Sequence, residues 1–208
     1  MKLQDAARIN PNAMLVHSKV LFDVFHPNSE HIEINDIAHA LSNICRYGGH
    51  SPKFYSVGQH SVLCSLVPGT YQEQMEALMH DSSEAYLADM PRPIKRNLPE
   101  YIRVENNLLE VIFKRFGLTF PLTPRVHKVD NDMLEFEYVS FFDDKDSNPD
   151  FDFWVPEKAK AAFLDRYNEL KLKIESEKEI TAWENGYLKY SEKQMLFYGS
   201  MDYFHFYI

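Results

Sequence analysis

Long apolar runs are absent from this sequence of 208 residues. No stretch approaches the roughly 18 consecutive apolar residues that a transmembrane helix needs, and residues 1–12 lack the apolar centre of a secretory signal. Internal repeats and low-complexity tracts are also missing, which argues against a repeat architecture. We therefore expect no membrane partner and a cytoplasmic location, in a bacterium or in a phage-infected host cell.

Cysteine is scarce as well, because only Cys45 and Cys64 are present and neither belongs to a CxxC motif. This scarcity argues against zinc or redox chemistry based on paired cysteines. Both residues have apolar neighbours in a helical pattern. That setting favours reduced thiols in a hydrophobic core over a disulfide.

Basic residues are outnumbered, since 22 Lys and Arg stand against 31 Asp and Glu and leave a formal net charge of −9. An acidic chain is unsuited to non-specific adhesion to nucleic-acid phosphates, so we expect no duplex nucleic acid as a partner. An anionic small molecule remains possible. A bound cation and a few focused basic side chains can reverse the local field within an acidic protein.

Helical periodicity dominates what is present. Apolar residues recur at spacings of three and four through most of the chain, and strand-like alternation is confined to the first 35 residues. This pattern predicts an all-α helical bundle, and 208 residues that are 45% hydrophobic suffice for one well-buried domain, which we place at residues 1–175. Predicted helices run from 35 or 36 to the Gly48-Gly49 pair, from 57, from 71 to near 88, from 99 to 116, from 124 and from 156.

Helix starts are marked by recognisable capping residues. Ser56 and Thr70 each precede a Gln or Glu by three positions, which is the spacing of a capping box. Thr123 precedes Pro124, a residue favoured in the first helical position. The apolar stripe of that helix is predicted at Val126, Val129, Met133 and Phe136.

Two segments outside the predicted bundle have unusual compositions. Residues 176–208 are rich in aromatic side chains and interrupted by glycines, so we predict an extension packed on the domain or on a partner subunit. Residues 141–154 are acidic but lack the twelve-residue spacing, with Gly and a terminal Glu, of a calcium loop. We interpret them as a solvated loop.

His80 and Asp81 form the most informative pair in the sequence, with His60 before it and Asp130 after it. Two imidazoles and two carboxylates are ligands with which a divalent cation activates water at neutral pH. Adjacent residues diverge by about 100° on a helix, so an ion shared by the pair must lie at the helix edge. Two further ligands must come from other helices, as His60 and Asp130 can in a bundle core. The alternative is that each histidine is an ordinary hydrogen-bonded core residue.

Glu84 and Asp89 are candidate catalytic residues. Glu84 lies four residues after His80 and three after Asp81, hence on the same side of a helix, where it can hold a water and act as general base or acid. Asp89 precedes a proline-rich loop and can cover the site as a second acid. The alternatives are a surface carboxylate for Glu84 and a turn residue for Asp89.

Arg46 and Lys95 are candidate phosphate-binding residues. Arg46 precedes a glycine-containing turn at residues 47–49, and Lys95 ends the PRPIK segment. Arginine offers a planar fork to phosphate oxygens, whereas lysine supplies a compact charge. A solvated surface cation is the alternative for each. Structural or surface positions are expected for His39, His50, His127 and His205.

The sequence closely resembles the HD-domain phosphohydrolases through three segments: RYGGHSPKFYSVGQHSVLCS, ALMHDSSEAYLADMPRPIKRNLPEYIRVENNLLEVIFKRFGL and VHKVDNDMLEFE. Within that superfamily it is similar to the branch of the YfbR-type 5′-deoxynucleotidases, the oxetanocin phosphohydrolase and the phage dATP triphosphohydrolases of the DatZ type. The likeness covers about residues 30–142.

The resemblance implies a role for each candidate. A Co²⁺, Mn²⁺, Zn²⁺, Fe²⁺ or Mg²⁺ ion would be held by His60, His80, Asp81 and Asp130. Asp130 is preferred to Asp132 because the frame V-x-x-x-D-x-x-x-L-x-x-E fits Val126, Asp130, Leu134 and Glu137. Glu84 and Asp89 would act on the attacking water or the leaving group. Phosphate and substrate contacts are implied for Arg46, Tyr47 and Lys95.

Two positions depart from the family pattern. Tyr47 stands where the 5′-nucleotidases have Trp, so contacts with the sugar or base differ. His127 stands where relatives with triphosphate activity have Lys, three residues before the final Asp. The number of phosphates removed is therefore open.

The function implied by the resemblance is metal-dependent hydrolysis of 2′-deoxynucleoside 5′-phosphates. A dNTP triphosphohydrolase of the dATPase kind, which releases deoxynucleoside and tripolyphosphate, is the first expectation. A 5′-deoxynucleotidase acting on dNMPs, a phosphodiesterase, and a nucleotide sensor without turnover are the alternatives. A homo-oligomer is expected because related enzymes are commonly dimers or larger.

Overall fold

The computed structural model describes residues 10–143 and 147–201, with side chains described to residue 181 and at residue 183. Helices dominate the described residues, which confirms the all-α prediction. The chain divides into two compact units, Met1–Leu170 and Lys171–Ile208. All the candidate site residues predicted from the sequence belong to the first unit.

A small hairpin precedes the helices. Strands β1 (Ala13–Leu15) and β2 (Leu21–Asp23) pair antiparallel, with Met14 opposite Phe22. The buried ring of Phe22 stacks on Tyr86, with 4.2 Å between ring centroids, and so fixes the hairpin to the helical core. Both strands fall within the first 35 residues, where the sequence predicted strand-like alternation. A short 3-10 turn, η1 (Ser29–His31), follows.

The first long helix is shorter than predicted. Helix α2 spans Ile34–Asn43 and ends before Ile44 and Cys45, rather than at the Gly48-Gly49 pair. Ile44 is extended, with φ −88° and ψ 123°, and its carbonyl accepts from Val57 N at 3.0 Å. Arg46 N donates to Tyr55 O at 2.9 Å. These bonds to residues 55–57 replace the bonds that a longer helix would make, and a 3-10 turn, η2 (Tyr47–Gly49), follows.

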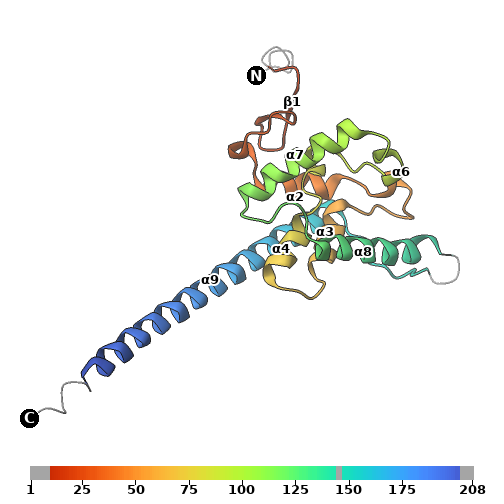
Figure 1. Ribbon diagram of the computed structural model, residues 1–208. Coiled ribbons are helices and arrows are strands. Elements are labelled where there is room, and N and C mark those ends of the chain that lie inside the picture. The colour runs from red at the N-terminus through yellow and green to blue at the C-terminus, as the bar shows by residue number, and fades with distance from the viewer. Residues whose placement is uncertain (1–9, 144–146, 202–208) are drawn as a thin grey trace, which may run out of the picture. The chain divides into compact units, whose positions relative to one another are not determined.

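Helix α3 (Val57–Ser65) lies at the centre of the first unit, because eight of its nine residues are buried. The Ser56 side chain caps it by accepting from Gln59 N, but the Gln59 side chain donates to Asp152 O instead of completing the predicted capping box. Figure 1 shows α3 beside α4 (Tyr71–Met79) and α8 (Pro124–Phe142), which it contacts. Thr70 caps α4 with a complete capping box, which confirms that prediction.

The third predicted helix is interrupted at the His-Asp pair. Helix α4 ends at Met79 instead of near Ala88, residues 80–83 form turns, and a separate one-turn helix, α5 (Glu84–Leu87), follows. A second one-turn helix, α6 (Arg92–Lys95), starts after Pro91. The long helix α7 (Pro99–Arg115) then covers the range predicted from the sequence.

Helix α8 starts as predicted, with Thr123 as the cap and Pro124 in the first position. Its apolar stripe is only partly correct. Val126 and Val129 are buried, but Phe136 is 50% exposed and its neighbour Glu137 is fully buried instead. The polar partners of Glu137, described below, hold that side of the helix inward.

Helix α9 spans Pro156–Met201 and crosses from the first unit into the second. Its first part packs in the core through Ala159, Phe163 and Leu170. The helix continues through the glycine at position 186, where the sequence suggested an interruption. Packing of residues 176–208 stays a prediction, since most of their side chains and residues 202–208, including His205, lie outside the described part. Among the described residues, no helix combines the length and apolar character that a membrane span requires.

Candidate metal centre

Four polar side chains from separate segments converge in the first unit. His60 comes from α3, His80 and Asp81 follow α4, and Asp130 comes from α8. Nε2 of His60 lies 3.4 Å from Nε2 of His80, 3.3 Å from Asp130 Oδ1 and 3.8 Å from Asp81 Oδ2. Nε2 of His80 lies 3.2 Å from Asp81 Oδ2 and 3.6 Å from Asp130 Oδ1. The structure thus brings together all four residues that the sequence proposed as metal ligands.

These spacings fit a single divalent ion. Nitrogen and oxygen ligands at about 2.0–2.2 Å from one ion in a tetrahedral arrangement lie about 3.3–3.6 Å apart. The five separations given above between these four atoms, 3.2–3.8 Å, bracket that range. A set of two imidazoles and two carboxylates suits transition metals better than calcium, which prefers oxygen ligands.

Both imidazoles are held with Nε2 toward the cluster. Nδ1 of His80 lies 2.7 Å from the Ala77 carbonyl, and Nδ1 of His60 lies 2.5 Å from Glu137 Oε1. A carbonyl and an ionised carboxylate only accept, so each Nδ1 carries the hydrogen. In the neutral imidazole Nε2 then keeps its lone pair, which is the form that binds a metal.

The backbone at the His-Asp pair is wound more tightly than an α-helix. Ser82 N donates to Met79 O at 2.9 Å and Glu84 N donates to Asp81 O at 2.9 Å, which are bonds three residues apart rather than four. Residues three apart eclipse one another in such a turn. This winding ends α4 early and keeps Glu84 on the same side as Asp81.

Opposite charges dominate the electrostatics of the cluster. Burial raises the pKa of Asp81 and Asp130, but the facing imidazoles outweigh burial and hold both pKa values well below the usual range. Burial likewise lowers the pKa of His80, and the two carboxylates outweigh it and raise that pKa well above its usual value. An incoming cation therefore displaces protons from the rings, so its affinity falls as pH falls.

Arg46 is buried between two carboxylates. Its Nη1 lies 3.4 Å from Asp81 Oδ2, and its Nε lies 3.3 Å from Glu137 Oε2. Burial lowers its pKa, but Glu137 and Asp81 outweigh burial and raise it, so the guanidinium stays charged. The side chain is therefore a fixed cation beside the four converging residues.

Glu137 is a residue to which the sequence assigned no role. It is fully buried, and its carboxylate accepts from Tyr47 Oη at 2.7 Å and from Tyr55 Oη at 2.6 Å, in addition to His60. The available signal was its spacing, because Glu137 follows Asp130 by two helical turns and so lies on the same face of α8.

Glu84 and Asp89 lie close to the cluster with raised pKa values. Burial, then Asp81 and Asp89, raise the pKa of Glu84 well above its usual value. Glu84 is 5% exposed, and its Oε2 has no hydrogen-bond partner among the described residues. Burial also raises the pKa of Asp89, although Arg46 opposes this. Both carboxyl groups therefore hold a proton more readily than an exposed acid does.

Lys95 and Arg92 both come from α6, and each forms an ion pair with a carboxylate. Lys95 Nζ lies 2.6 Å from Glu105 Oε2 on α7. Arg92 was not predicted as a site residue, yet its Nη2 donates to Asp130 Oδ2 at 2.6 Å and its Nη1 donates to Asn131 Oδ1 at 2.8 Å. Because the Arg92 side chain is 58% exposed, the ion pair between Arg92 and Asp130 lies at the mouth of the site.

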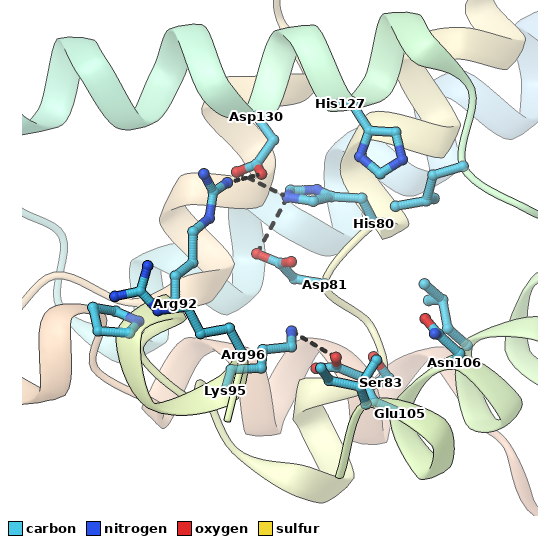
Figure 2. A pocket seen from close by; sticks show the side chains of 14 residues that line it. His80, Asp81, Ser83, Arg92, Lys95, Arg96, Glu105, Asn106, His127 and Asp130 are labelled. Carbon is cyan, nitrogen blue, oxygen red and sulfur yellow. Dashed lines mark hydrogen bonds and ion pairs between the residues drawn. The ribbon is translucent and has the colours of Figure 1, made fainter. Parts of the chain in front are cut away.

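Two cavities meet at the cluster. The larger, of about 600 Å³, extends along α6, α7 and α8; Figure 2 shows Arg92, Lys95 and Arg96 on one side of it and His127 and Asp130 on another. The smaller, of about 280 Å³, contains four sequence-predicted residues not found in the larger one: Arg46, Tyr47, Glu84 and Asp89. Both cavities are lined by Asp81, Arg92, Pro93, Lys95 and Asp130.

Comparison with known proteins gives a family but no activity. No family model matches the chain. The protein YfdR of Escherichia coli K12, described as uncharacterized, is 42% identical over 156 residues, which are 69% of this chain and 86% of that protein. The chain belongs to the YfdR family. An uncharacterized protein of Rhodobacter capsulatus is 34% identical over 105 residues, 46% of this chain and 54% of that protein.

This member of the YfdR family also has a thiol beside the cluster. Cys64 Sγ lies 3.5 Å from His60 Nε2, and His60, Cys64 and His80 are placed closely enough to share an ion. Both cysteines are free, as predicted. Cys64 is buried in an apolar cluster with Ala77, whereas Cys45 is only partly buried.

The remaining described histidines differ in position. The ring of His39 stacks on His17 with 3.8 Å between centroids, and His50 is exposed, which agrees with structural and surface positions. His127 is exposed as well, but it lines the larger cavity. The YfdR-family chain thus presents an imidazole to the space beside Asp130.

Proposed function

We propose that the chain is a metal-dependent phosphohydrolase of the HD-domain type that hydrolyses 2′-deoxynucleoside 5′-phosphates. The convergence of His60, His80, Asp81 and Asp130, with the fixed cation Arg46 beside them, carries this proposal. The order of these residues in the sequence matches the pattern of that superfamily. A divalent ion bound by the four would lower the pKa of a coordinated water and polarise a phosphoryl oxygen.

The remaining groups supply binding and proton transfer. Arg46 has further N–H donors beyond Nε and Nη1, and it lines the smaller cavity, so it can hold a phosphate oxygen there. Burial raises the pKa of both Glu84 and Asp89, Asp89 further raises that of Glu84, and both residues line the same cavity. Glu84 can therefore act on the attacking water, and Asp89 can act as an acid for the leaving 5′-oxygen.

A triphosphate is the first choice of substrate. Helix α6 and the residue that follows it place Arg92, Lys95 and Arg96 around the larger cavity. The carboxylates that line this cavity are already paired or belong to the cluster. Basic side chains on one wall suit a chain of phosphates. Deoxynucleoside and tripolyphosphate would be the products of a dATPase-like dNTP triphosphohydrolase.

A 5′-deoxynucleotidase is the second candidate. His127 stands where a lysine would add a further positive charge, which favours a substrate with fewer phosphates. A phosphodiesterase on the same scaffold would be distinguished by the substrate that it cleaves, and a nucleotide sensor is less well supported. The acid–base pair Glu84 and Asp89 lies beside the cluster, as turnover requires and a sensor does not.

Product analysis tests the proposal. The purified full chain is incubated with each dNTP and each dNMP in the presence of Mn²⁺ or Co²⁺, and the products are separated. We expect tripolyphosphate and deoxynucleoside from a dNTP. Orthophosphate from dNMPs alone would establish the nucleotidase instead, and no turnover of either class would refute the proposed function.

A further inference from the structure

Glu137 connects groups that belong to different parts of the centre. Oε1 accepts from His60 Nδ1 at 2.5 Å and from Tyr55 Oη at 2.6 Å. Oε2 accepts from Tyr47 Oη at 2.7 Å and lies 3.3 Å from Arg46 Nε. One carboxylate on α8 therefore contacts residues 46 and 47, residue 55 and helix α3.

The charge of Glu137 is maintained despite complete burial. Burial raises the pKa of this carboxyl, but His60 and Arg46 together with Tyr55 outweigh burial and lower the pKa to about 2. A buried carboxylate is stable only when its oxygens are fully hydrogen-bonded or ion-paired. Here Oε1 accepts two hydrogen bonds, and Oε2 accepts one hydrogen bond and forms an ion pair with Arg46 Nε, so the ionised form is well supported.

The partners of Glu137 present their opposite ends to the site. His60 has its Nε2 3.3 Å from Asp130 Oδ1, and Arg46 has its Nη1 3.4 Å from Asp81 Oδ2. Tyr47 lines the smaller cavity. Its backbone is in the left-handed region, with φ 58°. That conformation is uncommon for a residue other than glycine, and the bond to Glu137 helps to hold it.

We propose that Glu137 is the positioning residue of this centre. Its Oε1 fixes the His60 tautomer and ring orientation that leave Nε2 free for a metal, and its Oε2 fixes Arg46 and Tyr47 against the substrate cavity. Carboxylates that orient metal-bound histidines in this way contribute strongly to metal affinity. The part concerning Arg46 and Tyr47 rests on the proposed function, whereas the part concerning His60 requires only a metal.

Metal affinity of Glu137→Gln tests the proposal without any nucleotide. Glutamine keeps the volume but replaces one acceptor oxygen with an N–H₂ group, which only donates. The variant side chain therefore cannot accept hydrogen bonds at both of its terminal atoms, as the carboxylate does. We expect the full-length variant to bind Mn²⁺ about 10–100-fold more weakly than the wild type in calorimetric titration. The matched control is Glu76→Gln, because Glu76 is also buried but accepts from Gln72 and Thr119 N, and its Mn²⁺ affinity should not change.

Two tyrosine variants separate positioning from general stability. Tyr55→Phe removes a hydrogen-bond donor from Glu137 Oε1, which also contacts His60. Tyr47→Phe removes a donor from Glu137 Oε2, which also contacts Arg46. We expect weaker Mn²⁺ binding for Tyr55→Phe alone, and a raised KM at saturating Mn²⁺ for Tyr47→Phe. The different effects of these two variants test the proposal even if the Glu137→Gln variant does not fold. Equal effects of both variants on both quantities would indicate a merely structural role and overturn the proposal.

The outcomes also distinguish this proposal from the proposed function. Folded Glu137→Gln that binds Mn²⁺ as tightly as the wild type would refute positioning, even if the wild type hydrolyses nucleotides. A wild type that turns over no nucleotide, while Glu137→Gln shows weakened Mn²⁺ binding, would refute the function and support the positioning of His60. A wild type that binds no Mn²⁺ would overturn both.

Discussion

Asp81 has two kinds of partner, the imidazole of His80 at 3.2 Å and the guanidinium of Arg46 at 3.4 Å. Asp81→Asn removes its negative charge with little change of shape. We expect Mn²⁺ affinity to fall by more than about 100-fold, because residues that only orient metal ligands already contribute up to about that factor. Hydrolysis should disappear together with metal binding. Calorimetric titration and product analysis measure the two effects.

A neighbouring aspartate provides the control for that change. Asp132 is exposed and pairs with Lys128 at 2.6 Å on the outer side of α8. Asp132→Asn should leave Mn²⁺ affinity and turnover as they are. Metal binding that survives Asp81→Asn, or that is lost equally in Asp132→Asn, would contradict the assignment of Asp81 as a ligand.

Arg92 allows a second test at this scale, because its exposed side chain contacts the outer oxygen of Asp130. Arg92→Ala should change the free energy of unfolding by less than about 1 kcal/mol, as exposed ion pairs do. If Arg92 contacts a phosphate, its loss should raise the KM for a dNTP by about tenfold, equivalent to about 1.4 kcal/mol. Steady-state kinetics beside Arg103→Ala, which removes an exposed pair with Glu100, provides the comparison.

Residue types and spacing were enough to propose the four converging side chains, but not the groups that orient them. His60, His80, Asp81 and Asp130 are recognisable because imidazole and carboxylate are metal-ligand types and because their order matches the family that the sequence resembles. Glu137 acquires its role from two tyrosines and an arginine far away in the sequence. The spacing from Asp130 places Glu137 on the same face of α8, but its role depends on tertiary contacts that this spacing does not identify.

At the scale of elements, the close approach of α2 and α3 positions His60. A Cβ added to Gly58 would lie 2.7 Å from Ser42 Oγ and 3.1 Å from the Ser42 backbone. Gly58→Ala should therefore lower the free energy of unfolding by about 1–3 kcal/mol, because the two helices must move apart. Urea unfolding followed by circular dichroism measures this, and Mn²⁺ affinity should fall with the displacement of α3.

Gly69 offers a matched substitution outside the helix contact. The atoms nearest to an added Cβ there would be the ends of the flexible Arg125 and Glu73 side chains, at 3.0 Å. Gly69→Ala should change stability by less than about 1 kcal/mol and leave Mn²⁺ affinity unchanged. Equal stability losses at both glycines would show that the α2–α3 spacing is not the cause.

The starts of α3, α4 and α8 were easier to predict than the helix ends, whereas α2 starts at Ile34 after Glu33 rather than at residue 35 or 36. Ser56, Thr70 and Thr123 cap their helices through local side-chain bonds, which short sequence patterns reveal. The end of α2 depends on pairing between residues 44–46 and 55–57. The tight turns after Met79 likewise bring His80 and Asp81 toward residues that are distant in the sequence. Periodicity does not contain this information, so it predicted a longer helix.

For the whole molecule, the division of the chain predicts what a truncation retains. All residues of the candidate centre belong to the first unit. A chain that ends after residue 175, the boundary expected from the sequence, should bind Mn²⁺ within about twofold of the full chain, since no ligand or orienting group is lost. A greater loss of affinity in a folded truncated chain would contradict this division.

The same truncation tests the expected homo-oligomer. Leu172, Ile180 and Trp183 are 64%, 58% and 69% exposed, and their spacing places them on one side of α9. If residues 176–208 contribute to the contact between copies, the full chain should associate and the truncated chain should not. Light scattering coupled to size-exclusion chromatography gives the two masses, and equal assembly states would contradict a role for this segment.

The two cavities share Asp81, Asp130 and the side chains of α6, while their remaining walls differ. A bond broken at the shared residues would leave the two halves of the substrate in separate chambers. Neither half then has to wait for the other to depart, so release has no compulsory order. If the proposed hydrolysis takes place, a product that accumulates in either cavity would compete with a substrate that must span both, so each product should inhibit competitively.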